Sequence, residues 1–477
     1  MNLILLVLVA TIALAKPKIP IPTEEQVQWL ERGIAGFIHF GVNTYTDMEW
    51  GLGDEDPKIF NPVKLNTTQW VEAFQSIGAN EIILVTKHHD GFMLFPSEFS
   101  NHSVISSTWR DGKGDVVREF VDSCRQLGAI PSFYLSPWDR YFYNMTWKPE
   151  YNEYYSKTLD VLTSRYGPIY ELWWDGANAQ EHMTHLYDWQ GWYNILKRNQ
   201  PQCLGGGCGG DNHSFDCGPD ISWGWTESGM GNEENWHVHE PSVEFPGEEL
   251  VFAPLYLDVS IRPGWFYHAN EQPKTLAELV HIYFLSVGRN YQLQLNVPPN
   301  RDGLFDERDV QRLREFGEYL DRTFSQDEAW KATEARASSF EPGYPAANVV
   351  ANDKFLYWKP AGEVASGCVE LLFESPVSFN VVMTQEFLRH GQRVAHYTIA
   401  VLENGEWKEV AKGTTIGVKK LNVLEKTVTT TGVRLTVLDT WNDYVPEISR
   451  IGLFNSELYW IVCEKREKGE ECVEKSG

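Results

Sequence analysis

The residues best suited to chemistry are carboxylates, imidazoles and indoles that follow short apolar runs. The clearest run covers residues 170–176, Tyr-Glu-Leu-Trp-Trp-Asp-Gly, and is typical of a buried strand that ends at Asp175 and a glycine. A carboxylate at the carboxyl end of a barrel strand is placed for catalysis. Acids at strand ends also cap helices or start turns, so the run alone leaves both roles open.

Similar polar and aromatic clusters follow other predicted strands. They are His39 with residues 49–51, residues 87–91 (Lys-His-His-Asp-Gly), Tyr134 with residues 138–139, residues 223–227 (Trp-Gly-Trp-Thr-Glu), and Arg262 with Trp265. A parallel barrel collects the ends of its strands on one face, so these clusters are expected to converge. One isolated His is more often a core or loop residue, but several clusters in phase with strands indicate a site.

The residue types suit glycoside hydrolysis, which needs an acid for the leaving oxygen and a second carboxylate at the anomeric carbon. Asp175 is the candidate nucleophile and Glu227 the candidate acid/base. The alternative is a metal held by Asp175 with His39, His88 and His89. Adjacent histidines on a strand point to opposite faces, and no HxH or HExxH motif occurs. We therefore expect neither a metal nor a cofactor.

The elements that must position these residues alternate between strands and helices. Strands are predicted at residues 33–40, 81–86, 131–136, 170–174, 203–206, 220–225, 260–267 and 290–297. Helices are predicted at residues 67–77, 116–127, 151–166, 186–199, 276–287 and 307–323. Repeated strand–helix units of this size predict an α/β fold, a (β/α)8 TIM-like barrel over residues 16–330.

A different pattern begins after residue 330. Residues 331–456 contain short β-rich runs separated by turn residues, without a helical period, and predict a C-terminal β-sandwich. Residues 457–477 form a charged tail, of which only a pair of cysteines is expected to be ordered.

Composition limits the partners. The chain of 477 residues is 42% hydrophobic and 22% charged, as expected for a globular protein, and its formal charge is −25. That charge argues against nucleic acid and anionic membranes as partners. The 19 Trp, 21 Tyr and 24 Phe are compatible with sugar binding, because their rings offer flat apolar faces, or simply with a large aromatic core.

The N-terminus predicts secretion. Residues 1–15 form a short apolar run that ends in Ala-Leu-Ala, as in a cleavable signal peptide, and no later run is long enough to span a membrane. An extracellular location is expected, with a lysosome or vacuole as the alternative. Sequons at Asn66, Asn101, Asn144 and Asn212 agree with this.

Seven cysteines also fit an oxidising compartment. We expect a Cys463–Cys472 disulfide and one pair among Cys203, Cys208 and Cys217, with Cys124 as a buried free thiol.

Five stretches together resemble the α-L-fucosidases of glycoside hydrolase family 29: IHFGVNTY, TKHHDGF, LWWDG, RPGWFYH and LNVPPNRDG. They occur in that family's order over residues 30–325. The resemblance implies a barrel with a C-terminal sandwich and a retaining mechanism in which Asp175 is the nucleophile. It also implies a sugar pocket with Trp50 at its rim, lined by His39, His88, His89, Tyr134, Trp173, Arg262 and Trp265.

The acid/base varies in position within that family. A subgroup active on α-1,3/1,4-fucosyl branches carries a Trp-x-x-x-Glu-x-Gly pattern, which residues 223–229 match with Glu227, although Ser222 replaces the usual Arg. Glu233, Glu234 and Glu240 are competitors that more simply belong to a solvated acidic loop.

The expected protein is an exo-acting α-L-fucosidase that removes α-1,3/1,4-linked fucose from branched oligosaccharides or glycoprotein glycans. The alternatives are another retaining glycosidase on the same barrel and a non-catalytic fucose-binding protein. The C-terminal sandwich resembles galactose-binding-like modules, and its candidate glycan contacts are Trp358, Arg389, His390 and Trp441. A purely structural role for it is the favoured interpretation.

Overall fold

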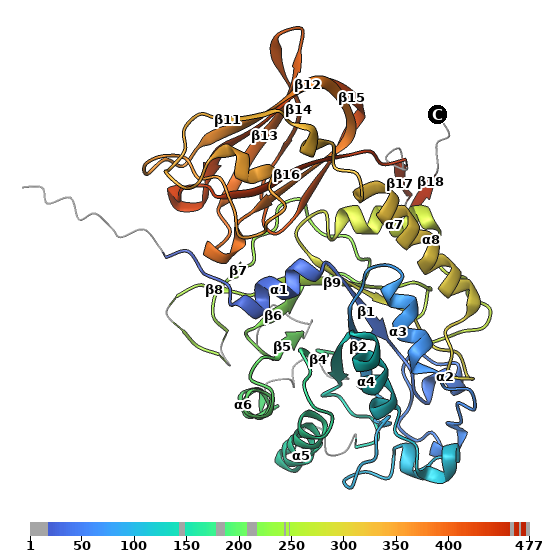
Figure 1. Cartoon of the computed structure of the whole chain (residues 1–477). Helices are drawn as coiled ribbons and strands as arrows, with labels where there is room; N and C mark the ends of the chain where they lie inside the picture. Colours follow the sequence, from blue (N-terminus) through green and yellow to red (C-terminus); the bar gives the residue numbers. More distant parts are fainter. Residues whose placement is uncertain are drawn as a thin grey trace, which may run out of the picture.

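The structure, a computed structural model, describes residues 18–142, 148–177, 187–207, 217–242, 245–247, 249–457, 462–466 and 469–473. It contains a closed parallel barrel followed by an antiparallel sheet domain, which confirms the predicted fold class (Figure 1). The proposed signal segment, two sequons (Asn144 and Asn212) and Cys208 lie outside the described residues.

Eight parallel strands close the barrel, because the last strand pairs with the first. In order around the barrel they are β1 (Ile34–Ile38), β2 (Glu81–Lys87), β3 (Ile130–Leu135), β4 (Glu171–Trp174), β5 (Leu204–Gly207), β6 (Ile221–Trp223), β9 (Leu255–Ser260) and β10 (Gln292–Asn296).

Six long helices pack around these strands: α3 (Thr67–Gln75), α4 (Val116–Leu127), α5 (Pro149–Arg165), α6 (Trp189–Asn199), α7 (Leu276–Leu285) and α8 (Glu307–Phe324). Each buries one apolar face, as an amphipathic helix on a sheet must. In α4, the side chain of Asp115 caps the first turn by accepting from the backbone N–H of Arg118, and Gly128 ends the helix with φ 71°.

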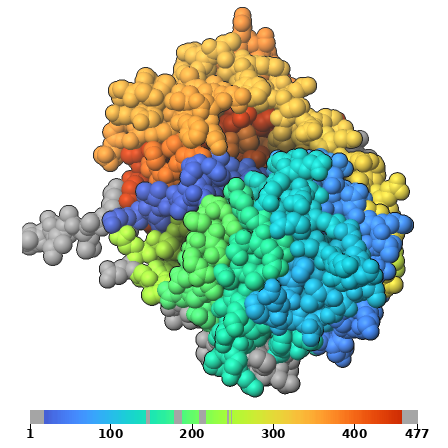
Figure 2. Space-filling view, turned by 60° about the horizontal axis from the view of Figure 1, so that its bottom comes forward, coloured from blue at the N-terminus to red at the C-terminus, as the bar shows by residue number. Residues whose placement is uncertain are grey.

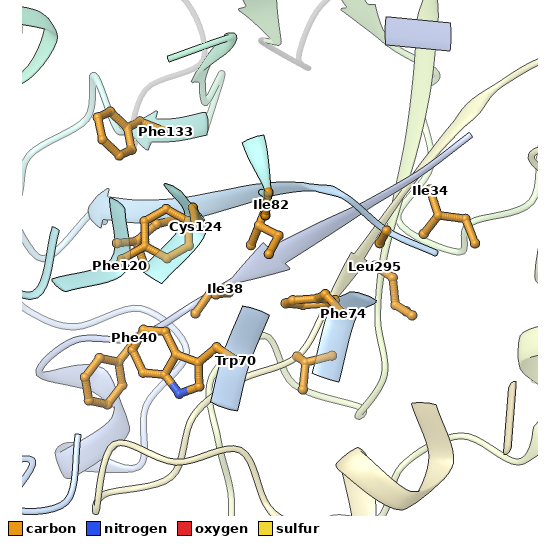
Figure 3. Packing of buried hydrophobic residues seen from close by; sticks show 14 of the residues in the cluster. Ile34, Ile38, Phe40, Trp70, Phe74, Ile82, Phe120, Cys124, Phe133 and Leu295 are labelled. Atoms are coloured by element: carbon orange, nitrogen blue, oxygen red, sulfur yellow. The ribbon is translucent and has the colours of Figure 1, made fainter. Parts of the chain in front are cut away.

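The layer between strands and helices is a continuous apolar core (Figure 3). Ile38 and Ile82 from the strands meet Trp70 and Phe74 of α3 there, all fully buried. Each such side chain contributes about 1.5–3 kcal/mol through burial. Gly36 permits the close contact, because a Cβ at that position would lie 2.7 Å from the ring of Phe74.

The strands alternate between this core and the barrel interior, with a period of two residues. Phe37, Tyr134, Trp173 and Tyr256 belong to the interior cluster. The hydrophobic residues next to the first three along the chain belong to the outer core. On β4 the inward positions are therefore 171 and 173, and the same alternation leads to Asp175.

A helix that the sequence analysis did not predict covers the N-terminal ends of the strands. It is α1 (Glu24–Arg32), which begins with a capping box between Thr23 and Gln26. Its buried Trp29 donates from Nε1 to Oε2 of Glu171 at 2.7 Å. The end of the barrel opposite the predicted site is thereby closed.

The C-terminal domain is sandwich-like, with the sheet order β11 (Glu334–Ala337), β12 (Gly367–Glu386), β15 (Lys420–Thr440), β13 (Val394–Glu403) and β14 (Glu406–Gly413), and with β16 (Ile448–Phe454) added beside β12. Register shifts between β12 and β15 interrupt their pairing, and the two long strands pair again beyond each shift. The domain rests on the barrel, and the N-terminal segment runs along their junction (Figure 2). Arg389 joins the two by pairing with Glu24 and Glu31, each at 2.9 Å.

Two predictions about elements were wrong, those for the seventh barrel strand and for the tail. The seventh barrel strand is β9 at residues 255–260, not residues 260–267, because the chain turns away before Pro263 and Gly264. The second half of the barrel has short strands: between β6 and β9 the described chain contains only the small hairpin of β7 (Val238–His239) and β8 (Val251–Phe252). The tail contains a hairpin of β17 (Val462–Arg466) and β18 (Gly469–Val473) rather than a frayed end.

The structure tests part of the predicted cysteine pairing. Cys124 is a buried free thiol, as predicted, and Cys203 is also free, so the pair expected within the cluster does not include Cys203. The backbone register places Cys463 opposite Cys472. Within the described residues, no helix is both long and apolar enough to cross a membrane.

Candidate active site

A cavity of about 280 Å³ opens at the carboxyl ends of the barrel strands. This volume lies near the lower end of the roughly 300–1,000 Å³ that is typical of small-molecule sites. Every sequence-predicted site residue except Arg262 lines it. The lining consists of Phe37, His39, Glu49, Trp50, His88, His89, Tyr134, Trp173, Asp175, Ala177, Trp223, Glu227, Asp258 and Trp265.

Asp175 lies one residue beyond the end of β4 and is held by three neighbours. The hydroxyl of Tyr134 donates to its Oδ2 at 2.7 Å, and the backbone N–H of Ala177 donates to its Oδ1 at 2.7 Å. Nε2 of His89 lies 3.5 Å from Oδ2. The side chain is 21% exposed, so an oriented carboxylate faces the cavity.

Three buried imidazoles form one wall. Burial lowers the pKa of His39 and of His89 to about 4, and burial with neighbouring positive charge holds the pKa of His88 well below its usual value. His39 contacts Oδ1 of Asn296 through Nδ1 at 2.9 Å, and His89 contacts the hydroxyl of Ser136 at 2.8 Å. All three rings are therefore neutral near pH 7.

The prediction that His88 and His89 point to opposite faces was wrong. β2 ends at Lys87, so both residues follow the strand and both line the cavity, with ring centroids 4.0 Å apart. Nδ1 of His88 is buried and has no hydrogen-bond partner among the described residues.

Glu227 enters the cavity from the loop after β6. Its pKa is raised, first by burial and then by the negative charges of Asp175 and Glu49, while a hydrogen bond from the Trp265 side chain acts in the opposite direction. The two candidate carboxylates therefore differ: Asp175 is oriented by donors, and Glu227 is biased toward the protonated form.

Two acidic residues of the cavity were absent from the predicted site, Glu49 and Asp258. Glu49 accepts hydrogen bonds from the backbone N–H of Trp265 at 2.7 Å and from Nε2 of His268 at 2.6 Å. Asp258 accepts from Nε1 of Trp223 at 2.7 Å, and burial raises its pKa to about 8. Phe37 and Ala177 were also missed, whereas Trp223 was named only as part of the cluster of residues 223–227.

A period-two pattern could have found Asp258. It lies on β9 between the inward-facing Tyr256 and the position of Ser260, but the predicted seventh strand began too late to include it. Glu49 had been named only as part of the cluster of residues 49–51, without a role of its own.

Arg262 lies outside the cavity, contrary to its predicted contact with a sugar. It is fully buried beneath the loop after β9, where Nε donates to Oδ2 of Asp309 at 2.8 Å and Nη1 donates to the carbonyl of Glu271 at 2.7 Å. A strand-end position does not fix the direction of a side chain, and this guanidinium supports the segment that carries Trp265.

The competing glutamates lie elsewhere. Glu233 pairs with Lys420 at 2.8 Å, Glu234 accepts from the indole of Trp236 at 2.9 Å, and none of the three competitors lines the cavity.

In the C-terminal domain, two candidate glycan contacts have structural roles. Trp358 is 1% exposed and belongs to the domain core, and Arg389 binds α1. Nδ1 of His390 contacts Glu447 at 2.8 Å, and Trp441 is half-buried and stacks on Tyr444. These placements favour the structural role of the domain. Across the described ranges, no group of three or more His, Cys, Asp and Glu side chains could hold a metal ion.

Comparisons with known proteins agree with the fold and the motifs. Residues 22–324 match the alpha-L-fucosidase family model, and residues 334–451 match the F5/8 type C domain. Alpha-L-fucosidase 1 of Arabidopsis thaliana is 38% identical over 459 residues, which cover 92% of this chain and 88% of that protein.

Solved structures give the same result. The crystal structure of SpGH29 has a TM-score of 0.83 and 32% identity, covering 93% of this chain and 100% of that chain. A Ruminococcus gnavus GH29 fucosidase in complex with fucose has a TM-score of 0.83 and 27% identity, covering 94% of this chain and 97% of that chain.

Proposed function

The chain belongs to the alpha-L-fucosidase family of glycoside hydrolases, and from this premise we propose that it removes terminal fucose by a retaining double displacement. Asp175 is the nucleophile and Glu227 the acid/base. The observation that carries the proposal is that both carboxylates line one cavity in different surroundings, one held by hydrogen-bond donors and one with a raised pKa.

In the first step, Asp175 attacks the anomeric carbon while Glu227 gives its proton to the departing oxygen. The hydroxyl of Tyr134 and the backbone N–H of Ala177 orient the attacking carboxylate. In the second step, the deprotonated Glu227 accepts a proton from water as that water attacks the glycosyl–enzyme ester. A retaining mechanism requires the two carboxyl groups to lie about 5–5.5 Å apart when the sugar is bound.

The neutral imidazoles and the aromatic walls bind the sugar. His39, His88 and His89 can each donate or accept one hydrogen bond to a hydroxyl, because their pKa values are held below the neutral range. The faces of Trp173 and Trp265 contact the apolar side of the ring. A small cavity closed below by α1 fits one terminal sugar and therefore exo action.

Replacement of the nucleophile tests the mechanism. Asp175→Ala should abolish turnover, and azide should partly restore it. From the space left by the carboxylate, azide attacks the anomeric carbon as the aglycone departs, which gives a fucosyl azide of inverted configuration. Near-normal activity of this variant contradicts the assignment. Glu240→Ala, which removes an exposed carboxylate outside the cavity, is the matched control.

Replacement of the acid/base is read on two substrates. For Glu227→Ala, the first step on an aryl fucoside with a good leaving group should suffer less than the first step on a natural glycan, because only the glycan needs protonation. An equal loss on both substrates assigns the acid role to another group.

We also propose a preference for α-1,3/1,4-linked fucose in branched glycans, supported by the pattern of residues 223–229 around Glu227. Release of fucose from 3- or 4-linked branched trisaccharides, with 2-linked ones spared, is the expected result. The reverse preference refutes this linkage assignment while the mechanism stands.

Secretion with N-glycosylation and disulfide formation completes the proposal. Two sequon asparagines, Asn66 and Asn101, lie on the exposed surface, where a glycan can be attached. Expression in eukaryotic cells, followed by enzymatic removal of N-glycans, should lower the mass of the secreted protein. Retention of the unmodified chain inside the cell contradicts this part.

A further inference from the structure

The loop after β6 carries an exposed indole beside the catalytic cavity. Trp225 is 49% exposed and lies two residues before Glu227. Its φ is 65°, in the left-handed region that bulky residues rarely occupy. A strained backbone at a solvent-exposed tryptophan needs a reason other than core packing, since the indole contributes little burial.

The loop is fixed at both ends, so the position of Trp225 is defined. The backbone N–H of Gly224 donates to the carbonyl of Tyr256 at 2.8 Å, and that of Gly231 donates to the carbonyl of Leu285 at 2.9 Å. Between these points Gly229 packs so closely that a Cβ would lie 2.8 Å from Ile282. The same anchored loop thus places both Trp225 and the acid/base.

Trp225 extends the wall of the cavity outward. Its ring lies 5.9 Å from that of Trp223, with an interplanar angle of 39°. Trp223 lines the cavity and is fixed by the bond from its Nε1 to Asp258 at 2.7 Å. An aromatic surface therefore runs from the inside of the cavity to the solvent.

The strand order sets a second exposed indole on the other side of the opening. Trp50, also 49% exposed, contacts His89 after β2 and Trp138 after β3, with ring centroids 5.4 and 5.3 Å away. β6 lies across the barrel from β2 and β3. When the terminal sugar of a substrate occupies the cavity, its next sugar lies at the opening, between Trp225 and Trp50.

We propose that Trp225, supported by Trp223, is the stacking platform for the sugar to which fucose is attached. The occupant is a pyranose ring of the leaving group, whose apolar C–H face covers the indole. Because Glu227 belongs to the same loop, a ring held on Trp225 has its glycosidic oxygen near the acid. This inference rests on the proposed roles of Asp175 and Glu227.

The test compares a substrate that has this ring with one that lacks it. For Trp225→Ala, kcat/KM on a trisaccharide with fucose linked to N-acetylglucosamine should fall about tenfold, as expected for loss of one aromatic stacking contact. On fucosyl fluoride, whose leaving group is a single atom, the variant should stay within about twofold of the wild type. Trp225→Tyr should recover most of the activity on the trisaccharide.

Three controls separate the possible outcomes. Trp330→Ala removes another exposed indole, which is 52% exposed and far along the chain. It should leave kcat/KM unchanged on both substrates. If Trp225→Ala lowers kcat/KM equally on both substrates, the residue only shapes the loop. If kcat/KM on the trisaccharide is unchanged, the sugar ring does not stack on Trp225. Either result overturns the platform. Full activity of Asp175→Ala instead refutes the proposed function, and it leaves the substrate ratio of the Trp225 variants as a separate result.

Discussion

Asp258 provides a sharp test of the electrostatics of the cavity. It is 4% exposed, it accepts from the indole of Trp223, and burial raises its pKa from 3.8 to about 8. In the unfolded chain this carboxyl loses its proton near pH 4, whereas in the folded protein it keeps the proton to about pH 8. Asp258→Asn keeps the hydrogen-bond acceptor for Trp223 and removes the titration.

The direction and size of the expected pH effect on the free energy of unfolding follow from proton linkage. Between pH 5 and 7 the folded state holds about one more proton at this site than the unfolded state, so the free energy of unfolding falls as pH rises. The slope from this group is about 1.4 kcal/mol per pH unit, or about 2.7 kcal/mol from pH 5 to 7. Its stabilising contribution is complete below pH 3.8 and is lost as pH rises through about 8.

The assay is denaturant unfolding followed by tryptophan fluorescence at pH 5, 6 and 7. As pH rises, the unfolding free energy of Asp258→Asn should increase relative to that of the wild type by about 1.4 kcal/mol per pH unit. The other titrating groups cancel in this difference. Asp122→Asn, at an exposed position of α4, is the matched control and should follow the wild type. Parallel pH curves for Asp258→Asn and the wild type refute a buried, protonated Asp258.

Two further results are expected. Glu49→Gln should move the basic limb of the kcat/KM profile to lower pH, because the charge of Glu49 raises the pKa of Glu227, the proposed acid. A limb that stays in place or moves to higher pH contradicts this coupling. Arg262→Met should lower the free energy of unfolding by about 3–5 kcal/mol, because it leaves the buried Asp309 without its partner, while KM for fucosyl fluoride stays close to that of the wild type. A large rise of KM without a loss of stability would instead return Arg262 to the sugar site.

The regular part of the barrel could be predicted from the sequence because its strands are continuous apolar runs. Residues 81–87 and 171–174 are buried throughout, and the helices between them carry one apolar face. The seventh strand was displaced because aromatic residues continue beyond Ser260, and only Pro263 and Gly264 mark the turn. The helix α1 has a readable start, the capping box of Thr23 and Gln26, but it follows Pro17, Pro20 and Pro22, which indicate an extended segment.

The site was predictable where the backbone alone determines direction. Asp175 continues the inward alternation of β4, so its place in the cavity follows from residues 171 and 173. His88, His89 and Arg262 follow the ends of their strands, where the period of two no longer applies. The two imidazoles turn into the cavity, and the guanidinium turns toward Asp309. Residues that follow a strand can therefore be predicted as a group, but their positions in the sequence do not show which of them face the cavity.

The two candidate catalytic carboxylates lie on parts of the barrel that are packed differently, and this difference bears on how such enzymes diversify. Asp175 follows a strand flanked by α5 and α6, whereas between β6 and β9 the described chain crosses without a helix. Insertions and deletions are best tolerated where few packed elements depend on the segment. Loop exchange between β6 and β9 is thus the natural route to new leaving-group selectivity, since it can vary the surroundings of Glu227, the proposed acid, while Asp175 and the lower part of the cavity stay intact.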